Sequence, residues 1–210
     1  TDAFIANGSA AWKLPVLADY PAINPPFVPA ELKGTWTPYQ RNGEGVRYWA
    51  VPGTEGFTHI LGGLEKDNAT GAISTNPENH HLMTQLRQQK IDNIKVPDVV
   101  VEGDKDDAEL LIVGFGGTYG HLHAAMDDMR AAGKKVALAH FKYINPLPKN
   151  TEEVLKKYPK VVVAEQNMGQ FAGYLRMKID GFVPNQYNEV KGQPFVVNEL
   201  VAAFTEIYNK

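Results

Sequence analysis

The fold of this chain is decided by residues 108–120, which read AELLIVGFGGTYG. Four apolar residues (110–113) open into a glycine-rich turn, and apolar side chains then recur at helical spacing from Leu122 to Met129. Two more apolar runs follow at residues 136–139 and 161–164, each preceded by a helical segment. Strands of this kind that alternate with helices are typical of a parallel sheet wrapped by its crossover helices. The sequence therefore predicts an α/β fold with a mostly parallel sheet flanked by helices.

The composition excludes several classes of function. The 210 residues include 21 Lys+Arg and 24 Asp+Glu, and the net charge of −3 indicates neither a nucleic-acid-binding protein nor an acidic tail. The absence of cysteine excludes disulfides, thiolate metal sites and cysteine nucleophiles within this sequence, and it fits a reducing compartment. No apolar run approaches the roughly eighteen residues of a membrane-spanning helix. We expect a cytoplasmic protein with no nucleic-acid partner and no membrane partner.

The N-terminal part differs in character from the rest. The first residue is Thr1, and residues 1–5 resemble the end of a strand, so we expect the chain to be cut from a longer polypeptide. Six prolines between residues 15 and 38 are interleaved with apolar side chains, and this spacing excludes a long helix. The pattern predicts an extended strap that lies over a protein surface.

A helix is predicted from Pro77 to about residue 91, because Asn76 can cap it and proline suits the first helical position. Its side chains Leu82, Met83 and Leu86 are expected to face inward.

Short strands are expected at residues 47–51 and 99–101. Asn150 is expected to cap a helix, with Glu153 as its partner in the capping motif. Apolar residues on one face predict a last helix over residues 197–208.

The glycine-rich turn at residues 114–120 is the first candidate site. It follows a strand and opens a helix, where backbone N–H groups and the helix dipole favour an anion. It nevertheless departs from the dinucleotide pattern, because Tyr119 stands at the third glycine position and His140 stands where an acidic residue should hold a ribose. The favoured interpretation is that Gly116 and Gly117 allow close strand–helix packing, with a partner chain against Thr118 and Tyr119. The candidate residues for an interface or an anion are Gly116, Gly117, Thr118 and Tyr119.

Other reactive groups give weaker signals. The six histidines do not have the spacing of a metal site, so no metal ligand is assigned. A third interpretation is a hydrolase that uses His140 and Glu165, and the absence of a Gly-x-Ser-x-Gly motif weighs against it. Glu165 ends a predicted strand and is expected to accept backbone hydrogen bonds. Aromatic residues near Arg41 and Arg47 are interpreted as core or interface. No catalytic residue is assigned.

Several motifs resemble the C-terminal part of the α subunit of 2-oxoacid:ferredoxin oxidoreductases, especially the 2-oxoglutarate enzymes. They extend over nearly the whole chain: NGS (7–9), WKLP (12–15), PGTEG (52–56), NHH (79–81) with Arg87 and Lys90, GFGGTYG (114–120), YINPLP (143–148), EQNMGQ (165–170) and KGQPF (191–195).

The resemblance implies a function for the whole enzyme. In that family, thiamine diphosphate decarboxylates a 2-oxoacid, coenzyme A accepts the acyl group, and iron–sulfur clusters pass electrons to ferredoxin. The resemblance implies that the catalytic carboxylate lies upstream and that a β subunit holds the diphosphate and magnesium. No cofactor is expected on this fragment itself. Its expected partners are the β subunit and the upstream pyrimidine-binding domain, with ferredoxin as partner of the whole complex.

The resemblance also implies a division into two parts. Residues 1–38 would be the end of the pyrimidine-binding domain plus the strap, and residues 39–210 would be an α/β domain similar to the transketolase C-terminal domain. The chain would then be a structural and interface domain, inactive by itself. The alternative is a stand-alone module that binds an anion or a nucleotide at the glycine-rich turn, residues 114–120.

Overall fold

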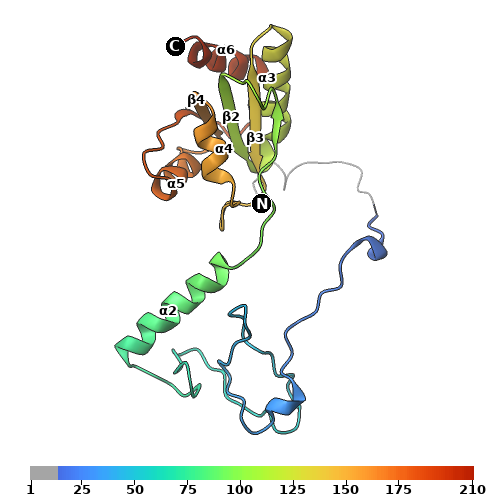
Figure 1. Cartoon of the computed structure of the whole chain (residues 1–210), viewed down its shortest axis with the longest axis vertical. Coiled ribbons are helices and arrows are strands. Elements are labelled where there is room, and N and C mark those ends of the chain that lie inside the picture. The colour runs from blue at the N-terminus through green and yellow to red at the C-terminus, as the bar shows by residue number, and fades with distance from the viewer. Residues whose placement is uncertain (1–13) are drawn as a thin grey trace. The chain divides into compact units, whose positions relative to one another are not determined.

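The computed structural model describes residues 14–210, which divide into an N-terminal unit (residues 14–95) and a C-terminal unit (residues 96–210) (Figure 1). The strand end expected at residues 1–5 lies outside the described residues. The boundary between these compact units does not test the domain division expected at residue 38, which stays a prediction.

The C-terminal unit is built around a five-stranded sheet. Its strands are β1 (Val101–Gly103), β2 (Leu110–Phe115), β3 (Val136–Phe141), β4 (Lys160–Glu165) and β5 (Asn185–Asn188). They lie in the order β1-β3-β2-β4-β5, and every neighbouring pair is parallel except β1 and β3. The mostly parallel sheet predicted from the sequence is therefore confirmed.

Helices cover both faces of this sheet: α3 (Tyr119–Ala131), α4 (Thr151–Lys157), α5 (Gln170–Lys178) and α6 (Val197–Tyr208) (Figure 1). In β2, Leu110 and Ile112 belong to the core with α3 and α6, whereas Leu111 and Val113 belong to the core with α4 and α5. All four side chains are fully buried. A strand buried on both faces needs apolar side chains at every position, which explains the continuous apolar run.

One predicted helix cap is wrong. Asn150 precedes α4, but its side chain does not cap this helix. Its Oδ1 instead accepts a hydrogen bond from Val99 N at 2.9 Å, and its Nδ2 donates to Val99 O at 2.9 Å. The extended chain before β1 has backbone groups that no strand partner satisfies, and the amide of Asn150 supplies both partners. The side chain thus fixes the entry to the sheet.

The N-terminal unit contains one long helix, α2 (Pro77–Asp92), and two short 3-10 turns, η1 (Leu17–Asp19) and η2 (Ala30–Leu32). Asn76 caps α2 as predicted, because its side chain accepts a hydrogen bond from Asn79 N. Met83 is buried as expected, but Leu82 is 40% exposed, so its predicted inward orientation is wrong.

The strand expected at residues 47–51 is also wrong. It is reduced to two single-residue bridges, Arg41 with Arg47 and Phe27 with Trp49. Each bridge joins a different partner segment, so no ladder of successive pairs develops. Whether the proline-rich strap, residues 15–38, lies over another protein surface stays a prediction. In the part of the chain from residue 14 onward, no helix combines the length and the apolar character needed to cross a membrane.

Candidate functional site

The glycine-rich turn joins β2 to α3 through a short 3-10 turn, η3 (Gly116–Thr118). Gly116 has φ of +64°, a left-handed conformation that favours glycine. A Cβ on Gly114 would meet Leu122 Cδ1 well inside contact distance and would lie 2.9 Å from Thr118 Oγ1. The close strand–helix approach expected at Gly116 and Gly117 is therefore found at Gly114, at the start of the turn, and Gly116 supplies the change of direction.

The two side chains predicted as site residues are engaged within the turn. Thr118 is buried, and its hydroxyl donates to Phe115 O at 2.8 Å and lies 3.4 Å from His140 Nε2. Tyr119 donates its hydroxyl hydrogen bond to Glu102 Oε2 at 3.0 Å, which raises the pKa of the phenol. The Tyr119 ring also lies edge-on to the ring of His140, with their centroids 5.2 Å apart. Thr118 and Tyr119 thus connect α3 to β1 and β3.

The charges around the turn do not favour an anion. His123 lies between two carboxylates, with Nε2 3.3 Å from Glu102 Oε2 and Nδ1 3.2 Å from Asp127 Oδ2. Burial lowers the pKa of His140, so this ring is held in its neutral form near neutral pH. Glu102, His140 and Lys142 also line a cavity of about 400 Å³ beside the turn. The two carboxylates leave the surroundings of Tyr119 unsuited to phosphate or carboxylate ligands.

The topology places a second loop near this turn. The chain goes from β2 to β3 on one side and then returns to β4 on the other side of β2, so the loops after β2 and β4 flank the point where the strand order reverses. In many α/β folds this point binds a ligand. Here Glu165 fills the equivalent position at the start of α5. Its two carboxylate oxygens accept from Phe171 N and Ala172 N, each at 2.8 Å.

The structural role expected for Glu165 is therefore confirmed. Its side chain is fully buried, and both oxygens are used by backbone N–H groups. A carboxylate in this position complements the helix dipole and satisfies two donors that have no partner within the helix. This arrangement gives no support to a hydrolase that uses Glu165.

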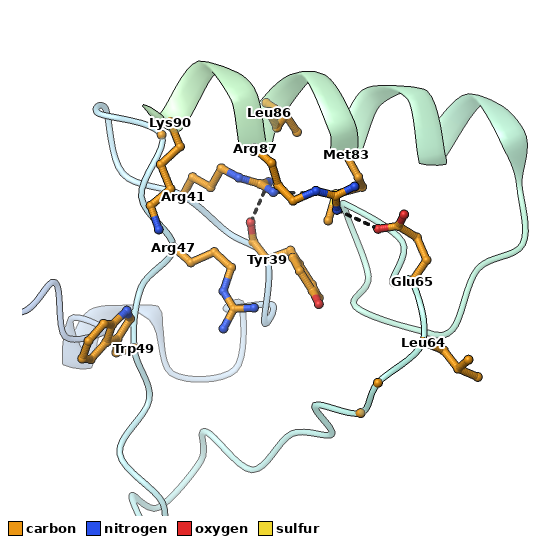
Figure 2. A pocket seen from close by; sticks show the side chains of 13 residues that line it. Tyr39, Arg41, Arg47, Trp49, Leu64, Glu65, Met83, Leu86, Arg87 and Lys90 are labelled. Carbon is orange, nitrogen blue, oxygen red and sulfur yellow. Dashed lines mark hydrogen bonds and ion pairs between the residues drawn. The ribbon is translucent and has the colours of Figure 1, made fainter. Parts of the chain in front are cut away.

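A second candidate site lies in the N-terminal unit and was not predicted as a site. A cavity of about 570 Å³ opens between α2 and the loops that precede it (Figure 2). Figure 2 shows Lys90 extending from α2 toward the segment that carries Arg41 and Arg47, whereas Arg87 points toward Glu65. The cavity is lined by four cationic side chains, one carboxylate and several apolar or small residues: Tyr39, Arg41, Gly45, Arg47, Trp49, Gly62, Gly63, Leu64, Glu65, Met83, Leu86, Arg87 and Lys90.

The arginines of this cavity are held by neutral groups more than by carboxylates. Arg41 donates to Tyr39 O at 3.0 Å and to the side-chain oxygen of Asn68. Burial lowers the pKa of Arg41, and the neighbouring charge of Arg47 lowers it further. The Arg47 guanidinium lies over the ring of Tyr39 at 4.7 Å from its centroid.

Of the four cationic side chains that line the cavity, Arg87 is paired with a carboxylate. Its Nη1 lies 3.0 Å from Glu65 Oε1, and His80 Nδ1 lies 2.6 Å from Glu65 Oε2. The hydrogen bonds from His80 and Arg87 hold the pKa of Glu65 below its usual value. Glu65 therefore stays ionised, and its two oxygens are shared between Arg87 and His80.

A sequence signal for this cavity existed but was incomplete. Arg41 and Arg47 lie close to Tyr39, Tyr48 and Trp49 in the sequence, and such a cluster by itself indicates a core or an interface. The other two cations stand about forty residues further along, on α2, and nothing in the sequence shows that the two groups converge. The fold of the loops was needed to bring them together.

Comparisons with known proteins identify relatives of this chain. Residues 108–199 match the family pyruvate:ferredoxin oxidoreductase core domain II. The 2-oxoglutarate oxidoreductase subunit KorA of Mycobacterium tuberculosis is 46% identical over 201 residues, which are 95% of this chain and 30% of that protein. The α subunit of 2-oxoacid:ferredoxin oxidoreductase 1 of Aeropyrum pernix is 28% identical over 218 residues, 98% of this chain and 33% of that protein.

One solved structure resembles this chain over most of the length of this chain. It is the 2-oxoglutarate:ferredoxin oxidoreductase of Magnetococcus marinus, solved with 2-oxoglutarate, coenzyme A and succinyl-CoA bound. The TM-score is 0.81 and the identity 30%, over 92% of this chain and 34% of that chain. The chain thus spans about a third of the length of the relatives that it matches.

Proposed function

We propose that the chain is the C-terminal part of a 2-oxoacid:ferredoxin oxidoreductase α subunit and acts there as a structural and interface domain, because residues 108–199 match the pyruvate:ferredoxin oxidoreductase core domain II and nearly the whole chain is similar to an α subunit of this kind. In the proposed whole enzyme, a 2-oxoacid is oxidatively decarboxylated to an acyl-CoA, with 2-oxoglutarate as substrate. The isolated chain is inactive in this proposal, and the complex works in the cytoplasm.

One observation carries the proposal. The identity of 46% with a 2-oxoglutarate oxidoreductase subunit extends over 95% of this chain, and therefore includes both compact units. The choice of 2-oxoglutarate among 2-oxoacids rests on the same relative, and on the solved structure that contains this substrate.

The residues of the glycine-rich turn favour the scaffold role. Gly114 and Gly116 serve packing and chain reversal, and Tyr119 is bound to the carboxylate of Glu102. We propose that the exposed face of Tyr119, which is 42% exposed, contacts another domain or the β subunit. The carboxylates beside it weigh against the alternative of an anion- or nucleotide-binding module at this turn.

The cofactors of the whole enzyme belong elsewhere in this proposal. A sequence without cysteine offers no thiolate for an iron–sulfur cluster. The carboxylates near the glycine-rich turn are engaged by Tyr119, His123 and backbone groups, so they do not form a set for magnesium and a diphosphate. In this proposal thiamine diphosphate, magnesium, the clusters and coenzyme A are held by the other domains and the β subunit, and ferredoxin docks on the complex.

The test is reconstitution. The complete α subunit that contains this sequence is co-expressed with its β subunit, and reduction of ferredoxin is measured with 2-oxoglutarate and coenzyme A. We expect activity from the complex, none from the isolated chain, and loss of the stable complex in size-exclusion chromatography when residues 96–210 are deleted. Turnover of 2-oxoglutarate by the isolated chain, or a deletion that leaves the complex intact, would contradict the scaffold role.

A further inference from the structure

The cavity of the N-terminal unit has a large excess of positive charge. Its lining includes four cationic side chains and one carboxylate, which leaves three uncompensated positive charges. Within residues 14–210, no ion pair links Arg41, Arg47 or Lys90 to a carboxylate. Like charges held around one volume repel each other, and an anion placed among them removes that cost.

The walls of the cavity are fixed by buried polar contacts. The side chain of Lys66 is buried, and its Nζ donates to Leu64 O at 2.7 Å and to Gly62 O at 3.2 Å. This contact holds the loop that closes one side. Asn79 connects that loop region to α2, since its Nδ2 donates to Lys66 O and its Oδ1 accepts from Asn68 N, both at 2.9 Å. The cationic side chains therefore project from a helix and loops that these hydrogen bonds hold in place.

The cations themselves are partly pre-positioned. Arg41 is half-buried and is anchored through Tyr39 O and Asn68. Arg47 is stacked over the Tyr39 ring. Ordering these side chains before binding reduces the entropy that a ligand would have to overcome. Lys90 stands on α2 three residues after Arg87, so both side chains lie on one face of the helix.

We propose that this cavity binds a small molecule that carries two or more phosphate groups. A guanidinium binds phosphate oxygens through two parallel N–H bonds, and several arginines around one volume match a ligand with several negative charges. The volume of about 570 Å³ lies within the range of small-molecule sites. The excess of three positive charges corresponds to a diphosphate more closely than to a single carboxylate.

Charge placement and shape distinguish this site from a solvated basic surface. Lys95 and Arg176 are exposed cations outside the cavity lining, and neither makes an ion pair within the described chain. They provide matched controls, because each can lose the same charge without changing the cavity. The proposal is independent of the proposed function, since it concerns a ligand of this chain alone.

The probe is inorganic pyrophosphate, titrated into the full chain by isothermal titration calorimetry in magnesium-free buffer. We expect saturable binding of one pyrophosphate per chain. Arg47→Gln should raise the dissociation constant about tenfold, which is the loss of affinity expected for one charge-assisted hydrogen bond. Arg176→Gln should leave the dissociation constant within about twofold of that of the natural sequence. Lys90→Gln and Lys95→Gln form a second pair with the same expected contrast, and Lys90 is exposed on α2, so its replacement leaves the fold intact.

Two further arms identify the chemistry. Citrate carries three carboxylates, and we expect it to bind about tenfold more weakly than pyrophosphate if the site selects phosphate. Raising the salt concentration should weaken pyrophosphate binding, because partly exposed charges are screened. The proposal is overturned if pyrophosphate does not saturate, if cavity and control variants lose affinity equally, or if citrate binds as tightly as pyrophosphate.

Discussion

Replacing Glu165 by glutamine is expected to destabilise the C-terminal unit strongly. The change keeps the volume of the side chain but replaces one charged oxygen by an NH₂ group, which then faces a backbone N–H of Phe171 or Ala172. One charge-assisted hydrogen bond is lost in a fully buried position, and one donor of α5 is left without an acceptor. We expect a loss of about 2–3 kcal/mol in the free energy of unfolding.

For a protein of this size the loss corresponds to a decrease in melting temperature of about 5–10 °C. The free energy is measured by urea denaturation followed by far-UV circular dichroism. Hydrogen exchange of the Phe171 and Ala172 amides reports the local effect. The matched control is Glu206→Gln on the exposed face of α6, which should stay within about 0.5 kcal/mol of the natural sequence. If both variants are equally stable, the carboxylate of Glu165 does not anchor α5.

Three other predictions follow from the same unit. Gly114→Ala should destabilise by about 1–3 kcal/mol through overpacking, whereas Gly120→Ala, where a Cβ meets no atom within 4 Å, should be neutral or stabilising in thermal denaturation. The hydrogen bond from Arg130 holds the pKa of Asp104 below its usual value, so its contribution is present above about pH 4 and is lost as the pH falls through the lowered pKa. Asp104→Asn should cost about 1 kcal/mol at neutral pH, measured by urea denaturation, and should remove that acid dependence; an unchanged acid profile would contradict the pairing. Burial lowers the pKa of His140, so stability should decrease as the pH falls below about 6.5, and His140→Asn should flatten the pH dependence of urea denaturation in this range. An equal slope in both proteins would show that other groups cause it.

The sheet and its helices could be predicted because burial leaves a strong pattern. Residues 110–113 and 161–164 are apolar at every position, since β2 and β4 are buried on both faces. The last helix lies at Val197–Tyr208 as predicted. The edge strand β5 was not predicted, because its sequence, NQYN, is mostly exposed and carries no apolar alternation. Backbone hydrogen bonds to β4 define this strand, and such bonds impose no pattern on the side chains that the sequence could reveal.

The candidate sites show a similar limit. The buried carboxylate of Glu165 could be predicted, because its partners lie only six and seven residues along the chain. The hydrogen bonds of Asn150 to Val99 span 51 residues, and the local capping pattern pointed to a different partner. The cationic cavity depends on residues from distant segments, and its frame is made by Lys66 and Asn79, whose roles are visible only in the folded chain.

The two edge strands of the sheet influence how this domain can associate with other proteins. Edge strand β1 has only three residues and is antiparallel to its neighbour β3, and edge strand β5 exposes several amide side chains. Short or polar edge strands are poor templates for pairing with a strand of another chain, so edge-to-edge aggregation of the sheet is disfavoured. We therefore expect assembly with other polypeptides to use helix surfaces and loops, which can be altered by mutation without disturbing the backbone hydrogen bonds of the sheet.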